Sequence, residues 1–495
     1  MLVVLVLATG MVGPTASGVL AAGPSSPPRE VPGLRQTPDI PVRTVGQRRA
    51  VPDHPRQTAG KGGGCDKDVD LTTTLDGVVT VAAQNNGICT TADIDTYQTT
   101  LTTYVVQAGG EEAAWTHTDV GSPSDPQMVG QFTWSGGAGK NTYTPDVKAF
   151  HQAGRRYLAL SLERFSLNAY CGVVLVDVTQ PSNPQVESQI YKDDRDDFWC
   201  DVHNSFVEDA DGDGDADLLY LTADARNDLR VVDISDVEQM PNACDVAAGC
   251  DREVGIYTAP TADNNNYVHD VTVLDHGSTV GRRVYLAYWD SGVVILDADE
   301  VATSGWQPLV GPDVIDERGF LAHHAWASRD GSLVFTQDEF LEQPGDEPVQ
   351  MWAVDGLKGP EKIDSLVLGA DVPANPAHNL EIRFDLDFDR LYVGWYKLGL
   401  QGWDFDAEGF QRTTRSVPFT ATVYHQAQTE AADDAYDGAW GVRLAQITVG
   451  QATHVYVFQS DRRYGLIIDC IGCTSSDVGG DEQPCPPGWK KQGRC

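Results

Sequence analysis

Basic residues are scarce in this chain of 495 residues. Lysine and arginine number 35 against 72 aspartates and glutamates, so the formal net charge is −37. A field of that sign repels phosphate backbones and anionic lipid surfaces, which argues against nucleic acid as a partner. After the first 22 residues, no apolar stretch reaches the length of a membrane-spanning helix. The sequence therefore predicts no nucleic-acid binding and no membrane span.

The familiar catalytic motifs are missing as well. The chain has no Gly-x-Ser-x-Gly elbow, no His-Glu-x-x-His, no P-loop and no Gly-x-Gly-x-x-Gly dinucleotide turn. Apolar residues almost nowhere follow the 3.6-residue spacing of a helix. These absences leave the function open and favour a fold built from strands.

The N-terminal segment has the character of an export signal. Residues 1–22 carry no charge, and an apolar run is followed by small residues up to Ala21 and Ala22. A membrane anchor is the alternative, but Gly10, Gly13 and Pro14 interrupt the segment. Residues 23–64 are rich in proline, glycine and arginine and are predicted to be a linker. We therefore expect a secreted, extracellular protein.

Ten cysteines, an even number, suit an exported protein with disulfides. The pairs expected from spacing are Cys244 with Cys250, Cys65 with Cys89, and Cys171 with Cys200. The other four form a cysteine-rich tail, residues 471–495 with the adjacent Cys470: Cys470, Cys473, Cys485 and Cys495. Their spacing fits a zinc ribbon poorly, so disulfides are favoured over a zinc site.

An apolar run that ends in aspartate recurs along the chain. The clearest copy is residues 173–177, Val-Val-Leu-Val-Asp, and the aspartates recur every 49 to 65 residues. The seven copies end at Asp119, Asp177, Asp233, Asp297, Asp355, Asp404 and Asp469. Each period has room for four short strands separated by turn residues. One small sheet cannot bury both faces but a ring of sheets can, so the pattern predicts an all-β fold, a β-propeller of seven four-stranded blades.

The ends of the repeat array predict how the ring closes. Little sequence after Asp469 resembles a fourth strand, whereas residues 78–81, Val-Val-Thr-Val, form an extra strand before the first copy. An N-terminal strand that completes the last blade would close the ring without loose edges. Six blades with a separate N-terminal sheet is the alternative. The propeller domain is expected to span residues 65–470.

The sequence Val-Val-Leu-Val-Asp-Val followed by Thr-Gln-Pro-Ser-Asn-Pro, at residues 173–184, resembles the LVIVD-repeat family of extracellular β-propeller proteins. The resemblance covers roughly residues 113–470 and weakens in the sixth copy. It implies a propeller fold and a secreted or surface location. It implies no catalytic residues, because the family has no settled activity.

One acidic segment has the pattern of a calcium loop. Carboxylates at loop positions 1, 3, 5 and 9 and glycine at position 6 resemble the start of an EF-hand, although Tyr220 replaces the final glutamate. The segment also looks like the loops of FG-GAP-type propellers, and the alternative is a solvated acidic turn. The expected structural Ca²⁺ ligands are Asp209, Asp211, Asp213, Asp215 through its carbonyl, and Asp217. The flanking residues 205–207 and 218–220 are predicted to be adjacent strands.

Histidines recur at equivalent positions of the repeat. His203, His269, His323 and His378 each begin the first strand of a blade, and Asp146 takes this place in the second copy. Such strands line the central channel of a propeller, where imidazoles and a carboxylate can hold a transition metal. The alternative is that these residues only fix neighbouring blades by hydrogen bonds. A shift of one residue in register would present His324 to the channel instead of His323.

Three hypotheses for function follow. The first is a calcium-stabilised extracellular binding protein for a protein partner or a small ligand. The second is a metalloenzyme (a hydrolase, lyase or oxidase) whose metal lies in the channel. The third is an adhesion module of the cell surface.

Overall fold

The computed structural model describes residues 29–31, 72–73, 78–84, 91–110, 114–134, 142–164, 169–191, 197–223, 226–259, 267–301, 305–317, 320–339, 347–354, 359–366, 377–383, 389–396, 399–405, 420–426, 438–462 and 465–473. The predicted signal peptide, most of the predicted linker and the tail beyond residue 473 lie outside these residues. Within the described part of the chain, no helix has the length and apolarity needed to cross a membrane.

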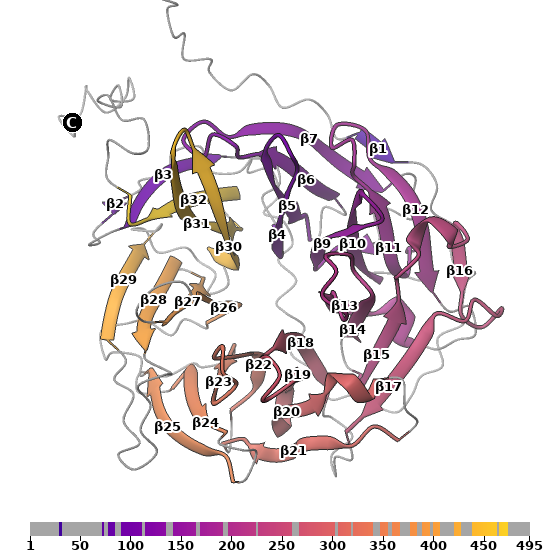
Figure 1. Cartoon of the computed structure of the whole chain (residues 1–495), viewed down its shortest axis with the longest axis vertical. Coiled ribbons are helices and arrows are strands. Elements are labelled where there is room, and N and C mark those ends of the chain that lie inside the picture. Colours follow the sequence, from indigo (N-terminus) through magenta and orange to yellow (C-terminus); the bar gives the residue numbers. More distant parts are fainter. Residues whose placement is uncertain are drawn as a thin grey trace, which may run out of the picture.

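Seven antiparallel four-stranded sheets, the blades, follow one another around a central axis (Figure 1). Blade 1 contains β4 (Ile94–Gln98), β5 (Thr103–Ala108), β6 (Ala114–Asp119) and β7 (Gln127–Trp134). Blade 2 contains β9 (Val147–Gln152), β10 (Arg155–Arg164), β11 (Gly172–Asp177) and β12 (Gln185–Tyr191). Blade 3 contains β13 (Val202–Glu208), β14 (Leu218–Ala223), β15 (Asp228–Asp233) and β17 (Glu253–Thr258).

The second half of the ring has the same construction. Blade 4 contains β18 (Val268–Asp275), β19 (Arg282–Tyr288), β20 (Gly292–Asp297) and β21 (Pro308–Ile315). Blade 5 contains β22 (Ala322–Ala327), β23 (Leu333–Asp338), β24 (Val349–Ala353) and β25 (Glu361–Leu366). Blade 6 contains β26 (Leu380–Arg383), β27 (Asp389–Trp395), β28 (Gly399–Phe405) and β29 (Thr420–Gln426).

Blade 7 joins the two ends of the ring. Its inner strands are β30 (Ala439–Val449), β31 (Ala452–Asp461) and β32 (Gly465–Ile471), and its outer strand is β3 (Val78–Gln84). β3 pairs antiparallel with β32, from Val78 opposite Ile471 to Gln84 opposite Leu466. The predicted seven-bladed propeller and its closure by an N-terminal strand are therefore confirmed, and the six-bladed alternative is wrong.

Short elements extend this frame. β1 (Arg29–Val31) pairs in parallel with β7, and β2 (Thr72–Thr73) pairs with β29. β8 (Thr142–Tyr143) and β16 (Ala243–Asp245) add to the edges of blade 2. Four short 3₁₀ turns occur among the described residues: η1 (Asp197–Cys200), η2 (Val237–Gln239), η3 (Trp289–Ser291) and η4 (Ala298–Glu300).

The repeated apolar run forms the third strand of each blade. In β11, the residues from Gly172 to Val176 are all buried, because the strand packs against neighbouring blades on both faces. Strands buried on both sides need continuous apolar runs instead of alternation, which explains the pattern Val-Val-Leu-Val. Clusters of buried side chains fill the spaces between blades, and these clusters form the core.

The aspartate that ends the third strand organises the following turn. Asp177 Oδ1 accepts the backbone N–H of Thr179 at 2.8 Å, and Asp119, Asp233 and Asp297 accept the equivalent N–H at 2.9, 2.9 and 3.0 Å. This is the Asx turn expected for the motif. Later copies differ: Asp404 binds Arg390, and Asp469 accepts from Gln459 at 2.6 Å, because β28 and β32 continue past these residues. Asp355 lies outside the described residues.

Candidate functional site

The first strand of each blade lies nearest to the propeller axis (Figure 1). His203 lies on β13, His269 on β18 and His323 on β22, and His378 lies two residues before β26. All four side chains are buried. His203, His269 and His323 therefore lie at the starts of first strands as expected, and His378 lies just before one.

The structure brings the four histidines together in a row. The ring centroids of His203 and His269 are 4.6 Å apart, those of His269 and His323 are 4.0 Å apart, and those of His323 and His378 are 4.4 Å apart. Trp440 on β30 continues the row, with its ring 4.2 Å from that of His378. Residues 54 to 66 positions apart in sequence thus meet, because equivalent positions of neighbouring blades lie side by side around the axis.

Residues at the ends of the second strands contact this row. Glu163 on β10 pairs with His203, and Glu339, which follows β23, lies 3.5 Å from Nε2 of His323 through Oε2. The rings of Trp289 and Tyr396, which follow β19 and β27, lie 5.2 Å from those of His269 and His378.

These second-strand partners were not found by the sequence reasoning. The available signal was a polar or aromatic residue directly after an apolar second strand, but this signal has no fixed spacing from the histidines. The connection becomes visible only in the tertiary structure, where neighbouring blades lie side by side. The row of four histidines together with Glu163, Glu339, Trp289, Tyr396 and Trp440 is called the axial cluster below.

Three members of the axial cluster have the geometry of metal ligands. His269, His323 and Glu339 each offer one ligand atom, and the three atoms lie within 4.8 Å of one another. All three side chains are buried. Asp146, which we expected beside the histidines, lies elsewhere: it binds Lys148, and its Oδ2 accepts the N–H and the hydroxyl of Ser205, each at 2.7 Å.

A cavity of about 250 Å³ opens beside the axial cluster. The first strands of all seven blades line it, so it lies on the axis. Its polar side chains include Asp270, His324 and Asn379, which are the direct neighbours in sequence of His269, His323 and His378. The ladder of β22 is irregular between Ala322 and His324, and at this point His324 lines the cavity while His323 belongs to the axial cluster.

Buried ion pairs surround the cavity. Lys148 binds both Asp93, at 2.5 Å, and Asp146. Arg443 Nε lies 2.7 Å from Asp95 Oδ1, and its Nη1 lies 3.4 Å from Glu381 Oε1. Buried charges of this kind persist only where partners and hydrogen bonds compensate the loss of water.

The positive charges of Lys148 and Arg443 do not balance all the carboxyl groups around the cavity. Burial raises the pKa of Glu381 to about 7, although Arg443 opposes the shift. Burial also raises the pKa of Asp146 to about 7, with Lys148 opposing and Asp93 adding to the rise. The pKa of Asp270 is well above its usual range for the same reason. Glu381 and Asp146 are therefore close to their titration points at neutral pH, as is common in functional sites.

His324 is neutral in this setting. Burial lowers its pKa to about 3, and His323 lowers it further. Its Nδ1 accepts the backbone N–H of Leu380 at 3.1 Å, so Nε2 carries the proton and donates to Thr272 Oγ1 at 3.2 Å. The cavity thus holds a fixed neutral imidazole beside Asp270.

The acidic loop connects β13 and β14, which pair as the sequence predicted. Asp209, Asp211 and Asp217 each bring a carboxylate oxygen within 4.8 Å of the others. Asp213 accepts the N–H of Asp215 at 2.8 Å, and the Asp215 carboxylate faces blade 2, 2.5 Å from Nδ1 of His151. The structure therefore gathers three of the five carboxylates. The loop also forms one wall of the cavity, through Asp209 and Gly214.

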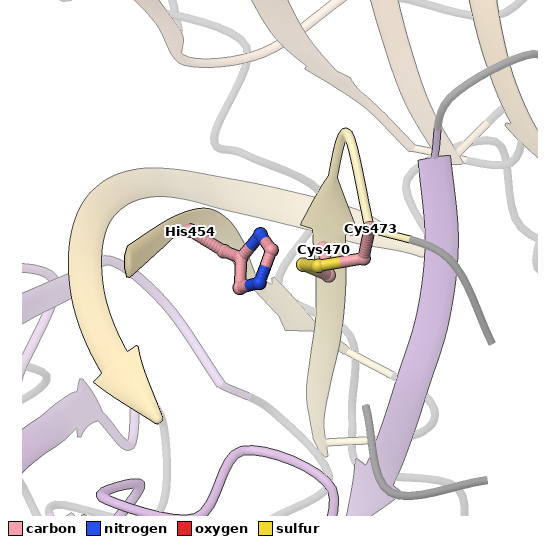
Figure 2. Close-up of side chains that lie close together, drawn as sticks. All are labelled: His454, Cys470 and Cys473. Carbon is pink, nitrogen blue, oxygen red and sulfur yellow. A yellow bond between two sulfur atoms is a disulfide. The ribbon is translucent and has the colours of Figure 1, made fainter. Parts of the chain in front are cut away.

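Three disulfides join described cysteines. Cys171–Cys200 and Cys244–Cys250 confirm the pairs expected from spacing, and Cys470–Cys473 is the third. Figure 2 shows the imidazole of His454 beside Cys470–Cys473, which gives a third group of close ligand atoms. Both sulfurs are bonded to each other, which agrees with the preference for disulfides over zinc in the tail. Cys65, Cys89, Cys485 and Cys495 lie outside the described residues.

Comparisons with known proteins find similarity among solved structures alone. No protein-family model and no curated protein matches the sequence. Among solved structures, the chain is similar to Raptor from Chaetomium thermophilum, with 10% sequence identity and a TM-score of 0.45. The match covers 82% of this chain and 30% of the Raptor chain.

Proposed function

We propose that this propeller is a binding protein whose axial cavity holds a small organic cation. The observation that carries the proposal is the charge of the cavity wall. Among its described lining residues are the acidic side chains Asp93, Asp95, Asp270 and Glu381, against the two cations Lys148 and Arg443. A bound cation would neutralise the negative charge that Lys148 and Arg443 leave uncompensated.

The remaining wall points to an organic cation of small size. Ile94, Phe206, Leu380 and Val442 supply apolar surface, and Trp326 supplies an aromatic ring. Aromatic faces attract quaternary ammonium and related cations. A cavity of about 250 Å³ is smaller than the roughly 300–1,000 Å³ that holds drug-sized ligands. Choline and putrescine are therefore suitable probes.

Titration calorimetry tests the proposal directly. We expect choline or putrescine to bind more tightly at pH 8 than at pH 6, because Glu381 and its neighbours must ionise to receive a cation. Binding should release protons, which comparison of two buffers with different ionisation heats would detect. The neutral isosteres 3,3-dimethylbutanol and 1,4-butanediol should not bind.

Variants locate the binding site. Glu381→Gln and Asp270→Asn should each weaken the binding of the cation about tenfold or more, since each removes a carboxyl group that can ionise against the cation. Glu361→Gln changes an exposed glutamate on the outer strand β25 and serves as the matched control. Equal affinity for the neutral isosteres, or cation binding that survives both cavity variants, would contradict the proposal.

We further propose that the protein is secreted and carries a structural Ca²⁺. The uncharged residues 1–22 and the disulfides support export to an oxidising compartment. The convergence of Asp209, Asp211 and Asp217 in the β13–β14 hairpin supports calcium, because three carboxylates in one turn repel one another without a cation. Membership of the LVIVD-repeat family rests on the repeat pattern and belongs to the same proposal.

A further inference from the structure

Hydrogen bonds fix the tautomer of two histidines in the axial cluster. His269 Nδ1 lies 3.2 Å from the backbone oxygen of His323, and His378 Nδ1 lies 2.8 Å from that of Trp440. A carbonyl oxygen only accepts hydrogen bonds, so Nδ1 is the donor in both rings. In a neutral imidazole the lone pair then resides on Nε2.

The same tautomer follows for His323 through a third residue. His323 Nδ1 lies 3.0 Å from Gln337 Oε1. Gln337 Nε2 donates to the backbone oxygen of Ala377 at 2.7 Å, which fixes the orientation of the amide and makes Oε1 an acceptor. Nδ1 of His323 is therefore the donor, and its Nε2 also carries the lone pair.

Two of these Nε2 atoms, those of His323 and His378, face the carboxylate of Glu339. His323 Nε2 lies 3.5 Å from Oε2, and His378 Nε2 lies 3.7 Å from Oε1. Glu339 is held in place by the hydroxyl of Tyr396, which donates to Oε1 at 2.5 Å. Lone pairs that face a carboxylate in a dry interior repel it unless a cation lies between them.

The distances are those of ligands around a metal ion. With bonds of about 2.1 Å and tetrahedral angles, two ligand atoms on one zinc ion lie about 3.4 Å apart. We propose that His269, His323 and Glu339 bind one divalent transition metal through imidazole nitrogens and the carboxylate, with His378 beside the same carboxylate. Imidazole and carboxylate donors suit Zn²⁺ or Fe²⁺, whereas Ca²⁺ takes oxygen ligands and Cu⁺ favours sulfur.

The surroundings of these four residues are those of an orienting outer shell. Each imidazole donates its other nitrogen to a carbonyl or amide oxygen, and the carboxylate accepts from a phenol. Such partners set ring orientation and raise ligand basicity in metal sites. The site differs from the one expected from sequence, because Glu339 replaces Asp146 and His203 pairs with Glu163. Its residues are not among those that line the proposed cation cavity.

Elemental analysis tests the site in the full-length protein. After loading with Zn²⁺, or with Fe²⁺ under anaerobic conditions, followed by dialysis, we expect about one transition-metal ion per chain, counted separately from calcium. X-ray absorption of the zinc form should show nitrogen and oxygen ligands with imidazole scattering. A folded wild-type protein that retains no transition metal would overturn the proposal, and would indicate an imidazolium–carboxylate cluster instead.

Variants and ligand type decide where the metal lies. Glu339→Gln and His323→Gln should each lose most of the metal, whereas the control His276→Gln, a histidine just beyond β18 that bonds to Arg329 and Tyr285, should retain it. Circular dichroism would establish that each variant folds. Sulfur ligands at about 2.3 Å would place the metal at Cys470 and Cys473 and overturn the assignment without any variant.

Discussion

Glu381→Gln is the sharpest test of the electrostatics of the cavity. The side chain is buried, its Oε2 accepts the N–H of Leu444 at 3.0 Å, and burial raises its pKa from 4.5 to about 7. The folded protein therefore holds this proton more tightly than the unfolded chain. The resulting stabilisation is fully present below pH 4.5 and is lost as the pH rises through 7.

The magnitude follows from the two pKa values. At 1.36 kcal/mol for each pH unit, the group contributes about 3 kcal/mol at low pH, and about 2–3 kcal/mol of this disappears between pH 5 and pH 8. Glutamine keeps the size of the side chain and can still accept from Leu444, but it does not titrate. Between pH 5 and pH 8, the free energy of unfolding of the variant should therefore fall by about 2–3 kcal/mol less than that of the wild type.

Urea unfolding at pH 5, 6, 7 and 8 measures this difference. Other groups that titrate near neutrality, such as Asp146, are common to both proteins and cancel in the comparison. The exposed control Glu361→Gln should follow the wild-type curve at every pH. If the free energies of unfolding of Glu381→Gln and wild type run parallel between pH 5 and pH 8, the burial argument for this cavity is refuted.

Other perturbations test the frame around the site. Gly172 has a φ of +90°, and a Cβ there would lie 1.9 Å from the oxygen of Ile190, so Gly172→Ala should cost about 2–4 kcal/mol. Gly154 has a φ of +81° with nothing within 4 Å, so Gly154→Ala should cost only about 1 kcal/mol, and equal losses in urea unfolding would contradict the packing argument. Asp177→Ala should lower the free energy of unfolding by about 1 kcal/mol, because the hydrogen bond to Thr179 is lost. Asp177→Asn should keep the turn. Identical unfolding curves for the wild type and the alanine variant would count against this role. Removal of calcium with EDTA should lower the melting temperature, since Ca²⁺ at 100 times its Kd adds about 3 kcal/mol to the free energy of unfolding. Asp209→Asn should abolish this response. If EDTA leaves the melting temperature of the wild type unchanged, the calcium proposal is wrong.

Much of the architecture could be read from the residues alone. Apolar runs that end in aspartate predict the third strands, because only a strand buried on both faces requires five consecutive apolar positions. The surplus strand before the first repeat and the missing strand after the last predict closure of the ring, since an unpaired edge is unfavourable. The cysteine positions predict Cys244–Cys250, which closes a loop of 6 residues, and Cys171–Cys200, which are 29 residues apart.

The contents of the axis depended on tertiary structure. Periodicity identifies His269, His323 and His378 as equivalent, but it leaves open which face of the strand each occupies, and a shift of one residue exchanges cavity and cluster. Glu339 and Glu163 come from second strands of blades, and no spacing rule connects them with the histidines. The sequence by itself determined the blades, because each repeat carries its own pattern of burial and turns. Only the ring, which brings residues of different blades side by side, decided which carboxylates meet which imidazoles.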